Sequence, residues 1–502
     1  MYTALVIGAG FSGIGAAIEL RRRGIDDFVV LERAQEVGGT WRDNVYPGVA
    51  CDVPSLLYSY SFEPAPWSKL YADGAEIQQY IRHVVDKYDV RRFVRFGHDV
   101  SSMTFDDAEG IWTVTTNQGQ LRAKNVIASY GPLANPSLPS IDGLEDFGGD
   151  VIHSAAWDRN HDFSGQTVAV IGTGSTAVQL IPELVKVAGK VVVFQRTAGW
   201  VLPRGNLRTP PRVLRFFGRF PFAQGLVRAG LFRATELSAL ALVWNTVLTS
   251  VVALAGKLFL RREVRDPWLR RLLTPRFRPG CKRMLVSDDY LKALQAENCQ
   301  VIAWPIARIG DNGVMTCEGV EHLADAIVCA TGYEVTKAAP PIDIVGRNGK
   351  SLNADWARGA FAYKSVSVAG YPNLFFTFGP NAGPGHTSAL VYMEAQIQYA
   401  AELISLMVKR KLTWLEVDAK AQADYNEWLQ HRLEKSTWNS GGCDSWYLTE
   451  DGFNATMFPG FATTYQKLLR DIDLHHYRAA GDLELAIGGP RTADLRSHAV
   501  NR

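Results

Sequence analysis

Buried strands that are each followed by a helix recur along this chain. Residues 3–7 and 28–31 are continuous apolar runs, and residues 14–23 between them have helical spacing. A continuous apolar run, rather than an alternating one, is typical of a strand covered on both faces in a parallel sheet. Further apolar strands are expected at residues 126–128, 167–171, 191–194, 325–330 and 375–379. The pattern predicts an α/β protein.

A glycine-rich turn follows the first strand. Gly8, Gly10 and Gly13 have the spacing Gly-x-Gly-x-x-Gly, and Glu32 ends the strand at residues 28–31. In such a unit the glycines allow the tight turn, admit a pyrophosphate and let helix and strand pack closely. The helix N-terminus faces the phosphates, and the acid accepts hydrogen bonds from ribose hydroxyls. Because strand, helix and acid all stand in register, we predict a dinucleotide site here.

The strand at residues 167–171 is followed by a second turn of the same kind. Gly172, Gly174 and Ala177 repeat the spacing as Gly-x-Gly-x-x-Ala. One turn binds one dinucleotide, so two turns in one chain indicate a flavin and a nicotinamide held face to face. The sequence therefore predicts an oxidoreductase built from two Rossmann-like dinucleotide-binding domains.

The second nucleotide site has a basic residue after its second strand, where the first site has an acidic one. The strand at residues 191–194 runs into Gln195, Arg196 and Thr197. An acid at this position repels a 2′-phosphate, whereas arginine grips it with two parallel hydrogen bonds. The pattern favours NADPH over NADH, with a surface arginine that binds nothing as the alternative.

A longer signature follows the first site. Gly38-Gly39-Thr40-Trp41 is followed by Tyr46-Pro47-Gly48 and then by Asp52. This series resembles that of the type I Baeyer–Villiger monooxygenases, class B flavoproteins of the flavin-containing monooxygenase superfamily. The resemblance implies an enzyme that uses FAD, NADPH and O2 to convert a ketone to an ester or lactone through a C4a-peroxyflavin. The FAD-binding residues expected are Gly8, Gly10, Gly13, Glu32, Gly39, Thr40, Trp41 and Asp52.

A third motif lies between the two nucleotide sites and carries the same resemblance. It reads Phe147-x-Gly149-x3-His153-x3-Trp157-Asp158. In the family this motif lies where the linker meets the nicotinamide domain, and its closing Trp-Asp is typical of the Baeyer–Villiger branch. The resemblance gives His153 a conformational role rather than that of a general base.

The resemblance also points to catalytic residues. Arg283 matches the essential arginine of the family, and Asp52 is its expected partner. A permanent cation beside the flavin keeps an oxygen adduct anionic, and arginine keeps its proton where lysine loses it. Asp52 orients the guanidinium and offsets the cost of burying it. The NADP-binding residues expected are Gly172, Gly174, Ala177, Arg196, Thr197, Lys282 and Trp446, with a core tryptophan as the alternative for Trp446.

Two other functions remain open at this stage. A flavin monooxygenase that oxygenates amines or sulfides uses a protonated adduct, against which Arg283 and the ending Trp157-Asp158 argue. A non-catalytic flavoprotein or an uncoupled NADPH oxidase is the more remote alternative. The six cysteines show no close pairing. We therefore expect neither a disulfide scaffold nor a dithiol beside the flavin, and no metal site.

The region 204–279 fits no nucleotide-binding pattern. It carries 15 Lys and Arg residues against Glu236, Glu263 and Asp266, and residues 237–256 carry no charge. That stretch is long enough to cross a membrane, but its polar residues weaken this interpretation. We expect a helical cap over the substrate site. Peripheral contact with an anionic membrane is the alternative, and a nucleic-acid role is not expected.

These patterns predict how the domains are organised. A chain of 502 residues is too long for one ordinary core, so several domains are expected. The NADP-binding domain is inserted in the FAD-binding domain, and the cap is inserted in the NADP-binding domain. The chain begins directly with a strand, so the cytoplasm is the expected compartment, with membrane association as a possibility. The expected ranges are 1–145 and 361–477 for FAD, 146–203 and 280–360 for NADP, 204–279 for the cap, and 478–502 for a loose tail.

Overall fold

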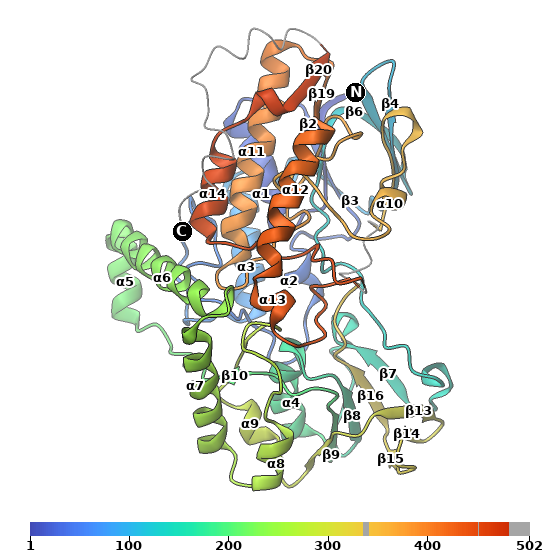
Figure 1. Ribbon diagram of the computed structural model, residues 1–502, viewed down its shortest axis with the longest axis vertical. Helices are drawn as coiled ribbons and strands as arrows, with labels where there is room; N and C mark the ends of the chain where they lie inside the picture. The colour runs from blue at the N-terminus through green and yellow to red at the C-terminus, as the bar shows by residue number, and fades with distance from the viewer. Residues whose placement is uncertain (335–340, 450, 481–502) are drawn as a thin grey trace.

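The computed structural model describes residues 1–334, 341–449 and 451–480. Its larger sheet has eight strands in the order β17-β4-β5-β6-β1-β2-β3, with β18 paired to β6 (Figure 1). The strands are β1 (Tyr2–Ile7), β2 (Phe28–Glu32), β3 (Val94–Phe96), β4 (Val100–Asp106), β5 (Ile111–Thr116), β6 (Gly119–Ala128), β17 (Asp343–Val345) and β18 (Leu374–Phe376). β1 pairs in parallel with β2 and β6, and its residues Ala4 to Ile7 are buried, as the continuous apolar run predicted. The antiparallel meander β4-β5-β6 was not predicted.

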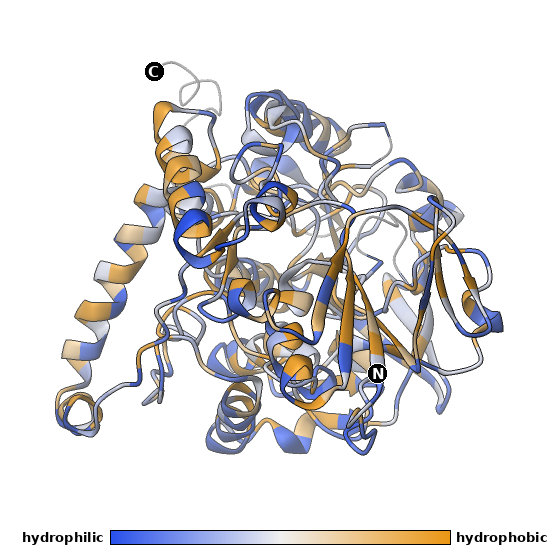
Figure 2. Ribbon diagram, turned by 90° about the horizontal axis from the view of Figure 1, so that it is seen from below, coloured by the Kyte–Doolittle hydropathy of each residue, from blue (hydrophilic) through white to orange (hydrophobic). Residues whose placement is uncertain are grey.

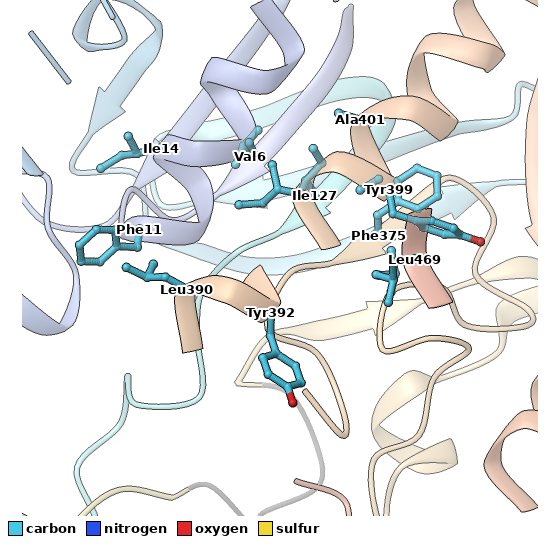
Figure 3. Close-up of a cluster of buried hydrophobic side chains, with 14 of the residues drawn as sticks. Val6, Phe11, Ile14, Ile127, Phe375, Leu390, Tyr392, Tyr399, Ala401 and Leu469 are labelled. Atoms are coloured by element: carbon cyan, nitrogen blue, oxygen red, sulfur yellow. The ribbon is translucent and has the colours of Figure 1, made fainter. Parts of the chain in front are cut away.

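A layer of helices covers one face of this sheet. The helices of the domain are α1 (Phe11–Arg22), α2 (Thr40–Asp43), α3 (Gly74–Lys87), α10 (Leu352–Asp355), α11 (Ala389–Arg410), α12 (Ala419–Glu434), α13 (Thr437–Ser440) and α14 (Ala462–Arg470). Figure 3 shows Val6, Ile127 and Phe375 from three strands facing side chains of α1 and α11. The two helices pack tightly, since a Cβ on Gly15 would lie 2.8 Å from the Ile397 side chain. The short strands β19 (Trp414–Val417) and β20 (Tyr477–Ala480) pair beside this layer.

A second, smaller sheet has five parallel strands in the order β12-β9-β8-β16-β7 (Figure 1). Its strands are β7 (Asp150–His153), β8 (Thr167–Ile171), β9 (Lys190–Phe194), β12 (Cys299–Ile302) and β16 (Ala326–Cys329), and its helices are α4 (Ser175–Val187) and α9 (Tyr290–Ala293). The hairpin strands β13 (Ile306–Gly310), β14 (Gly313–Thr316) and β15 (Glu321–Leu323) form a separate small sheet. The two predicted Rossmann-like units are thus present, one in each sheet.

The return from the second domain to the first comes earlier than the predicted boundary at residue 360. β17 pairs with β4 of the larger sheet, and Ile344 and Leu352 are buried in the core beneath that sheet. Residues 343–355 therefore belong with the FAD-binding fold. Pattern alone missed this because the segment is short and its pairing partner lies far away in the sequence. Most of the predicted tail, residues 481–502, lies outside the described residues.

The insertion at residues 204–279 is helical, as expected. It consists of α5 (Pro211–Arg219), α6 (Pro221–Leu242), α7 (Val247–Glu263) and α8 (Pro267–Leu272), and the short strands β10 (Val201–Leu202) and β11 (Leu285–Val286) pair where it leaves and rejoins the domain. α5 and α6 project from the body as an arm (Figures 1 and 2). The uncharged stretch 237–256 is broken between α6 and α7, where Thr246 and Thr249 form a capping box. Among the described residues, no helix is both long enough and apolar enough to span a membrane.

We predict that Gly13→Ala disrupts the FAD-binding unit. A Cβ at this position would lie 1.8 Å from the Gly8 carbonyl oxygen, so α1 must move away from β1. Overpacking of this kind costs about 1–3 kcal/mol. Flavin absorbance per protein and the midpoint of thermal unfolding should both fall. Gly225→Ala in the exposed part of α6 is the matched control, because no atom lies within 4 Å of its added Cβ. A Gly13→Ala protein with full flavin content would contradict the prediction.

Candidate active site

One large cavity joins the two domains. Its volume is about 1770 Å³, and both glycine-rich turns open into it. Of the residues expected at the site, its walls include Gly8, Gly10, Glu32, Gly39, Thr40, Trp41, Asp52, Gly172, Gly174, Arg196, Thr197, Lys282, Arg283 and Trp446. The fold therefore brings both predicted nucleotide sites and the predicted catalytic pair to one space.

The first turn has the shape that a pyrophosphate needs. Gly8 has φ +102°, and a Cβ there would lie 2.7 Å from the Ser129 carbonyl oxygen. A Cβ on Gly39 would lie 3.2 Å from the Cα of Gly10, so two bare glycines face each other across the entrance. Gly10 is the N-cap of α1, and no side chain caps the helix, which leaves its first N–H groups to a bound phosphate.

Glu32 is buried at the end of β2 and fixes the turn before any ligand binds. Its carboxylate accepts hydrogen bonds from the backbone N–H groups of Ala9 at 2.8 Å and Ala34 at 3.0 Å. Arg42 donates to the same carboxylate at 2.9 Å. Because each carboxylate oxygen has two lone pairs, Glu32 keeps capacity for a ribose hydroxyl.

The long signature joins the two domains. The Tyr46 hydroxyl lies 2.9 Å from Oε1 of Gln179 on α4, and Gln179 Nε2 donates to the Ala50 carbonyl oxygen at 2.9 Å. A Cβ on Gly48 would lie 2.5 Å from the Gln179 carbonyl oxygen, which explains the glycine. Trp41 Nε1 donates to the Tyr58 hydroxyl at 3.0 Å. Gln179 and Tyr58 belong to this site, and sequence reasoning missed both because no local motif marks them.

The second turn repeats the geometry of the first. Gly172 has φ +117°, and a Cβ there would lie 2.5 Å from the Ala330 carbonyl oxygen. Gly174 is the N-cap of α4 and has no atom within 4 Å of an added Cβ, so it faces open cavity. Ala177 is fully buried where helix and strand meet. A dinucleotide pyrophosphate fits this opening.

A cluster of positive charge lies beside the second turn. Arg196 and Thr197 follow β9 and are exposed to the cavity, and the Thr197 carbonyl oxygen accepts a hydrogen bond from Thr173 at 3.1 Å. The pKa of Lys282 is lowered by burial and by the neighbouring charge of Arg196. An anion that binds between two neighbouring cations relieves their repulsion and is held by both charges. The arrangement fits the 2′-phosphate of NADP(H).

Asp52 and Arg283 form a two-pronged ion pair on the cavity wall. Arg283 Nε donates to Oδ2 of Asp52, and Nη2 donates to Oδ1 at 2.6 Å. Burial alone raises the pKa of Asp52, but the charge and hydrogen bonds of Arg283 hold it below its ordinary value. The charge of Asp52 in turn raises the pKa of Arg283. The guanidinium keeps its charge, and 40% of its side chain remains exposed toward the cavity.

The motif between the sites forms the edge of the NADP-binding domain. Phe147 is buried in the core below the smaller sheet, and a Cβ on Gly149 would lie 2.2 Å from the Asp325 carbonyl oxygen. His153 ends β7, where its Nδ1 accepts from the Ala155 N–H at 3.1 Å, and burial lowers its pKa. Trp157 stacks on Phe163, and Asp158 accepts from the Asn160 N–H at 2.8 Å. These contacts are all made within the NADP-binding domain.

The segment with Trp446 completes the cavity wall. Trp446 is 48% exposed and lies 4.4 Å from the Tyr447 ring, so it is not a core tryptophan. Tyr447 is buried, and burial raises its pKa to about 12 although Arg283 acts in the opposite direction. Tyr447 is a third residue of the site, after Gln179 and Tyr58, that the sequence did not mark.

A disulfide joins Cys281 to Cys443 across 162 positions of the sequence. The wide spacing of the six cysteines gave no sign of this single bond. Neither cysteine lines the cofactor cavity, so the pair is not a dithiol facing the flavin.

Fold and site together define a flavoprotein oxidoreductase that binds FAD and NADP(H). A family profile described as pyridine nucleotide-disulphide oxidoreductase matches residues 5–206. A Baeyer–Villiger monooxygenase of Pseudomonas aeruginosa is 40% identical over 475 residues, covering 94% of this chain and 90% of that protein. A Baeyer–Villiger monooxygenase of Streptomyces coelicolor is 39% identical over 485 residues, covering 96% and 93%.

Solved structures of monooxygenases also match this chain over nearly its whole length. The closed structure of a cyclohexanone monooxygenase is 27% identical, has a TM-score of 0.86 and covers 96% of this chain and 99% of its own. A complex of OTEMO with FAD and NADP is 25% identical, with a TM-score of 0.87 and coverage of 95% and 99%. This chain belongs to the Baeyer–Villiger monooxygenases, FAD-dependent enzymes that oxygenate ketones with NADPH and O2.

We predict that the double substitution Arg196→Ala and Lys282→Ala weakens the binding of NADPH but not that of NADH. Hydrogen bonds to a charged group contribute about 1.5–3 kcal/mol, so the KM for NADPH should rise by at least about tenfold. The KM for NADH should change little, because NADH lacks the 2′-phosphate. Arg122→Ala is the control, since that arginine pairs with Glu109 and does not line the cavity. An equal rise in KM for both nucleotides would contradict the assignment of Arg196 and Lys282 to the 2′-phosphate.

Proposed function

We propose that this enzyme converts a ketone to an ester or lactone, with Arg283 as its catalytic residue and Asp52 as the residue that positions it. The observation that carries the proposal is the two-pronged Asp52–Arg283 pair on the wall of the cavity that both nucleotide turns share. When bound, NADPH would supply hydride and FAD would supply the reactivity toward O2. The protein supplies binding, orientation and a fixed positive charge.

The role of Arg283 follows from its charge and its geometry. Its guanidinium stabilises negative charge on oxygen as oxygen is transferred to the carbonyl carbon, and it stabilises the oxyanion that forms there. Asp52 accepts from Nε and Nη2, which leaves Nη1 without a hydrogen-bond partner among the described residues. This N–H group can therefore donate to a reacting oxygen while the ion pair holds the side chain in place.

Most of the other predicted site residues serve cofactor binding in this proposal. Gly8, Gly10, Gly13, Glu32, Gly39, Thr40 and Trp41 hold FAD; Gly172, Gly174, Ala177, Arg196, Thr197, Lys282 and Trp446 hold NADP(H). Phe147, Gly149, His153, Trp157 and Asp158 form the joint between linker and NADP-binding domain. The solved neighbours include monooxygenases named for cyclohexanone and for steroids, so a test panel should span small cyclic and large fused ketones.

We predict that Arg283→Ala separates the two halves of the reaction. Anaerobic reduction of the flavin by NADPH should remain measurable, whereas ester or lactone formation in air should fall about 10²–10³-fold. Arg276→Ala, an exposed arginine outside the cofactor cavity, is the control for loss of charge on the same segment.

Two results would contradict this proposal. Conversion of thioethers but of no ketone in the panel would favour an enzyme that oxygenates sulfur. Unchanged ester formation by the Arg283→Ala protein would remove this residue from the chemistry.

We further propose that the arm formed by α5 and α6 rests on an anionic membrane surface, where an apolar ketone collects. Phe216, Phe220 and Phe222 are 49%, 42% and 69% exposed at the corner between these helices. The ring centroids of Phe216 and Phe220 are 5.2 Å apart, and those of Phe220 and Phe222 are 6.1 Å apart. Exposed aromatic clusters of this kind enter the boundary between headgroups and acyl chains.

Arginines surround this aromatic cluster. Arg212, Arg215 and Arg219 are exposed on α5, and none forms an ion pair with a residue in the described ranges. Each basic residue near an anionic bilayer contributes about 1 kcal/mol. Self-association through this corner would bring arginine against arginine, so a lipid surface is the better partner.

We predict that the protein sediments with phosphatidylglycerol vesicles and that salt releases it. The triple substitution of Phe216, Phe220 and Phe222 by serine should reduce binding about tenfold or more. Leu323→Ser on β15 is the control for loss of an exposed apolar side chain, since Leu323 is 64% exposed. Binding that is indifferent to lipid charge and to salt would refute the proposal. A dimer that the triple substitution dissociates would favour self-association instead.

A further inference from the structure

The Cys281–Cys443 disulfide connects two segments that build one wall of the cofactor cavity. Cys281 directly precedes Lys282 and Arg283, and Cys443 lies three positions before Trp446. Lys282, Arg283 and Trp446 all line the cavity, although the sulfurs themselves do not. The bond therefore fixes the cationic segment relative to the tryptophan segment from behind.

Little else holds these two segments together. Residues 273–284 and 441–447 form turns and bends rather than helix or strand. Within the described ranges, one backbone hydrogen bond links them, from the Arg278 N–H to the Gly441 carbonyl oxygen at 3.0 Å. The other backbone hydrogen bonds of residues 445–449 stay local, such as Leu448 N–H to the Ser445 carbonyl oxygen at 3.1 Å. The disulfide is thus the strongest connection between the segments.

Glycines in both segments allow the chain to pack closely around the disulfide. A Cβ on Gly441 would lie 2.6 Å from Cβ and 2.7 Å from Sγ of Cys281, so only glycine fits against the bond. Gly280 has φ +90°, and a Cβ there would lie 2.5 Å from the Leu242 carbonyl oxygen at the end of α6. Cys281 itself is fully buried beside Trp200 and Phe277.

A basic hollow borders the residues that flank both cysteines, although neither cysteine lines it. A cavity of about 480 Å³ is lined by residues 275–279 on one side and residues 440–442 on the other. Lys257, Arg276 and Arg278 contribute positive charge to its walls, and no acidic side chain lines it. Positive charge attracts thiolates and thiols that carry carboxylates, which are the species that exchange with disulfides.

We propose that the Cys281–Cys443 disulfide positions the Trp446 segment against Lys282 and Arg283, and that thiols arriving through the basic hollow open it and loosen the NADP(H) site. A thiolate attacks one sulfur and forms a mixed disulfide, and the other cysteine sulfur leaves as thiolate and takes a proton. A second small thiolate then attacks the mixed disulfide at the small-molecule sulfur, and the protein cysteine leaves as a thiolate and takes a proton. The protein S–S bond is reduced to two S–H groups, and the two small thiols are oxidised to one disulfide.

Opening the bond weakens nucleotide binding more than it slows the chemical step. Asp52 still holds Arg283 in the reduced enzyme, so the catalytic charge stays in place. The Trp446 segment, by contrast, loses its covalent attachment and must be ordered when NADP(H) binds, which raises KM. This inference rests on the proposed contact between Trp446 and NADP(H).

The test compares the oxidised enzyme with the same enzyme reduced by dithiothreitol, with the two states assigned by alkylation and mass spectrometry. Reduction should raise the KM for NADPH about three- to tenfold while kcat falls less than twofold. It should also increase the NADPH consumed per ester formed. Oxidised dithiothreitol should restore the original values. A merely structural bond would lower the unfolding temperature and leave KM and the yield per NADPH unchanged, and that result would overturn the proposal.

Three variants make the test specific. Cys443→Ser should show the reduced-state KM and should not respond to dithiothreitol. Cys317→Ser, which removes an exposed cysteine that forms no disulfide, should respond like the unaltered enzyme. Trp446→Ala separates the two proposals: an unchanged KM for NADPH would refute the nucleotide contact. A raised KM in Trp446→Ala, combined with no effect of reduction, would refute the disulfide's role alone.

Discussion

The ion pair between Asp52 and Arg283 is the contact on which the rest of this structure depends. Its two residues are 231 positions apart, one following the FAD-binding signature and the other following the helical insertion. The pair therefore connects the FAD-binding domain to the segment that follows the insertion. An unpaired charge that is partly withdrawn from water is costly, and pairing offsets that cost while leaving a permanent charge at the cavity wall.

The interface around this pair is built from the same signature. Tyr46 and Gly48 pack on α4 through Gln179, which places the NADP-binding turn opposite the FAD-binding turn. The cations Arg196 and Lys282 line the cavity, and so does Arg283 beside Asp52. In the proposed function, Arg196 and Lys282 bind the anionic nucleotide, and Arg283 stabilises the negative charge that develops on oxygen.

The sequence predicted the local parts of this design and missed the long-range ones. The glycine turns, Glu32 and the Arg196-Thr197 pair are contiguous motifs whose geometry follows from their residue types. The meander β4-β5-β6, the return of β17 to the larger sheet and the Cys281–Cys443 bond depend on contacts between distant segments. No spacing rule marks such contacts, and Gln179, Tyr58 and Tyr447 belong to the site only because folding brings them there.

Rescue of the Arg283→Ala protein by free guanidinium tests the central claim most directly. If a positive charge at this position supports oxygen transfer, millimolar guanidinium should restore a measurable part of ester formation, and urea, which has the same shape without the charge, should not. Equal recovery with urea and guanidinium would contradict the account.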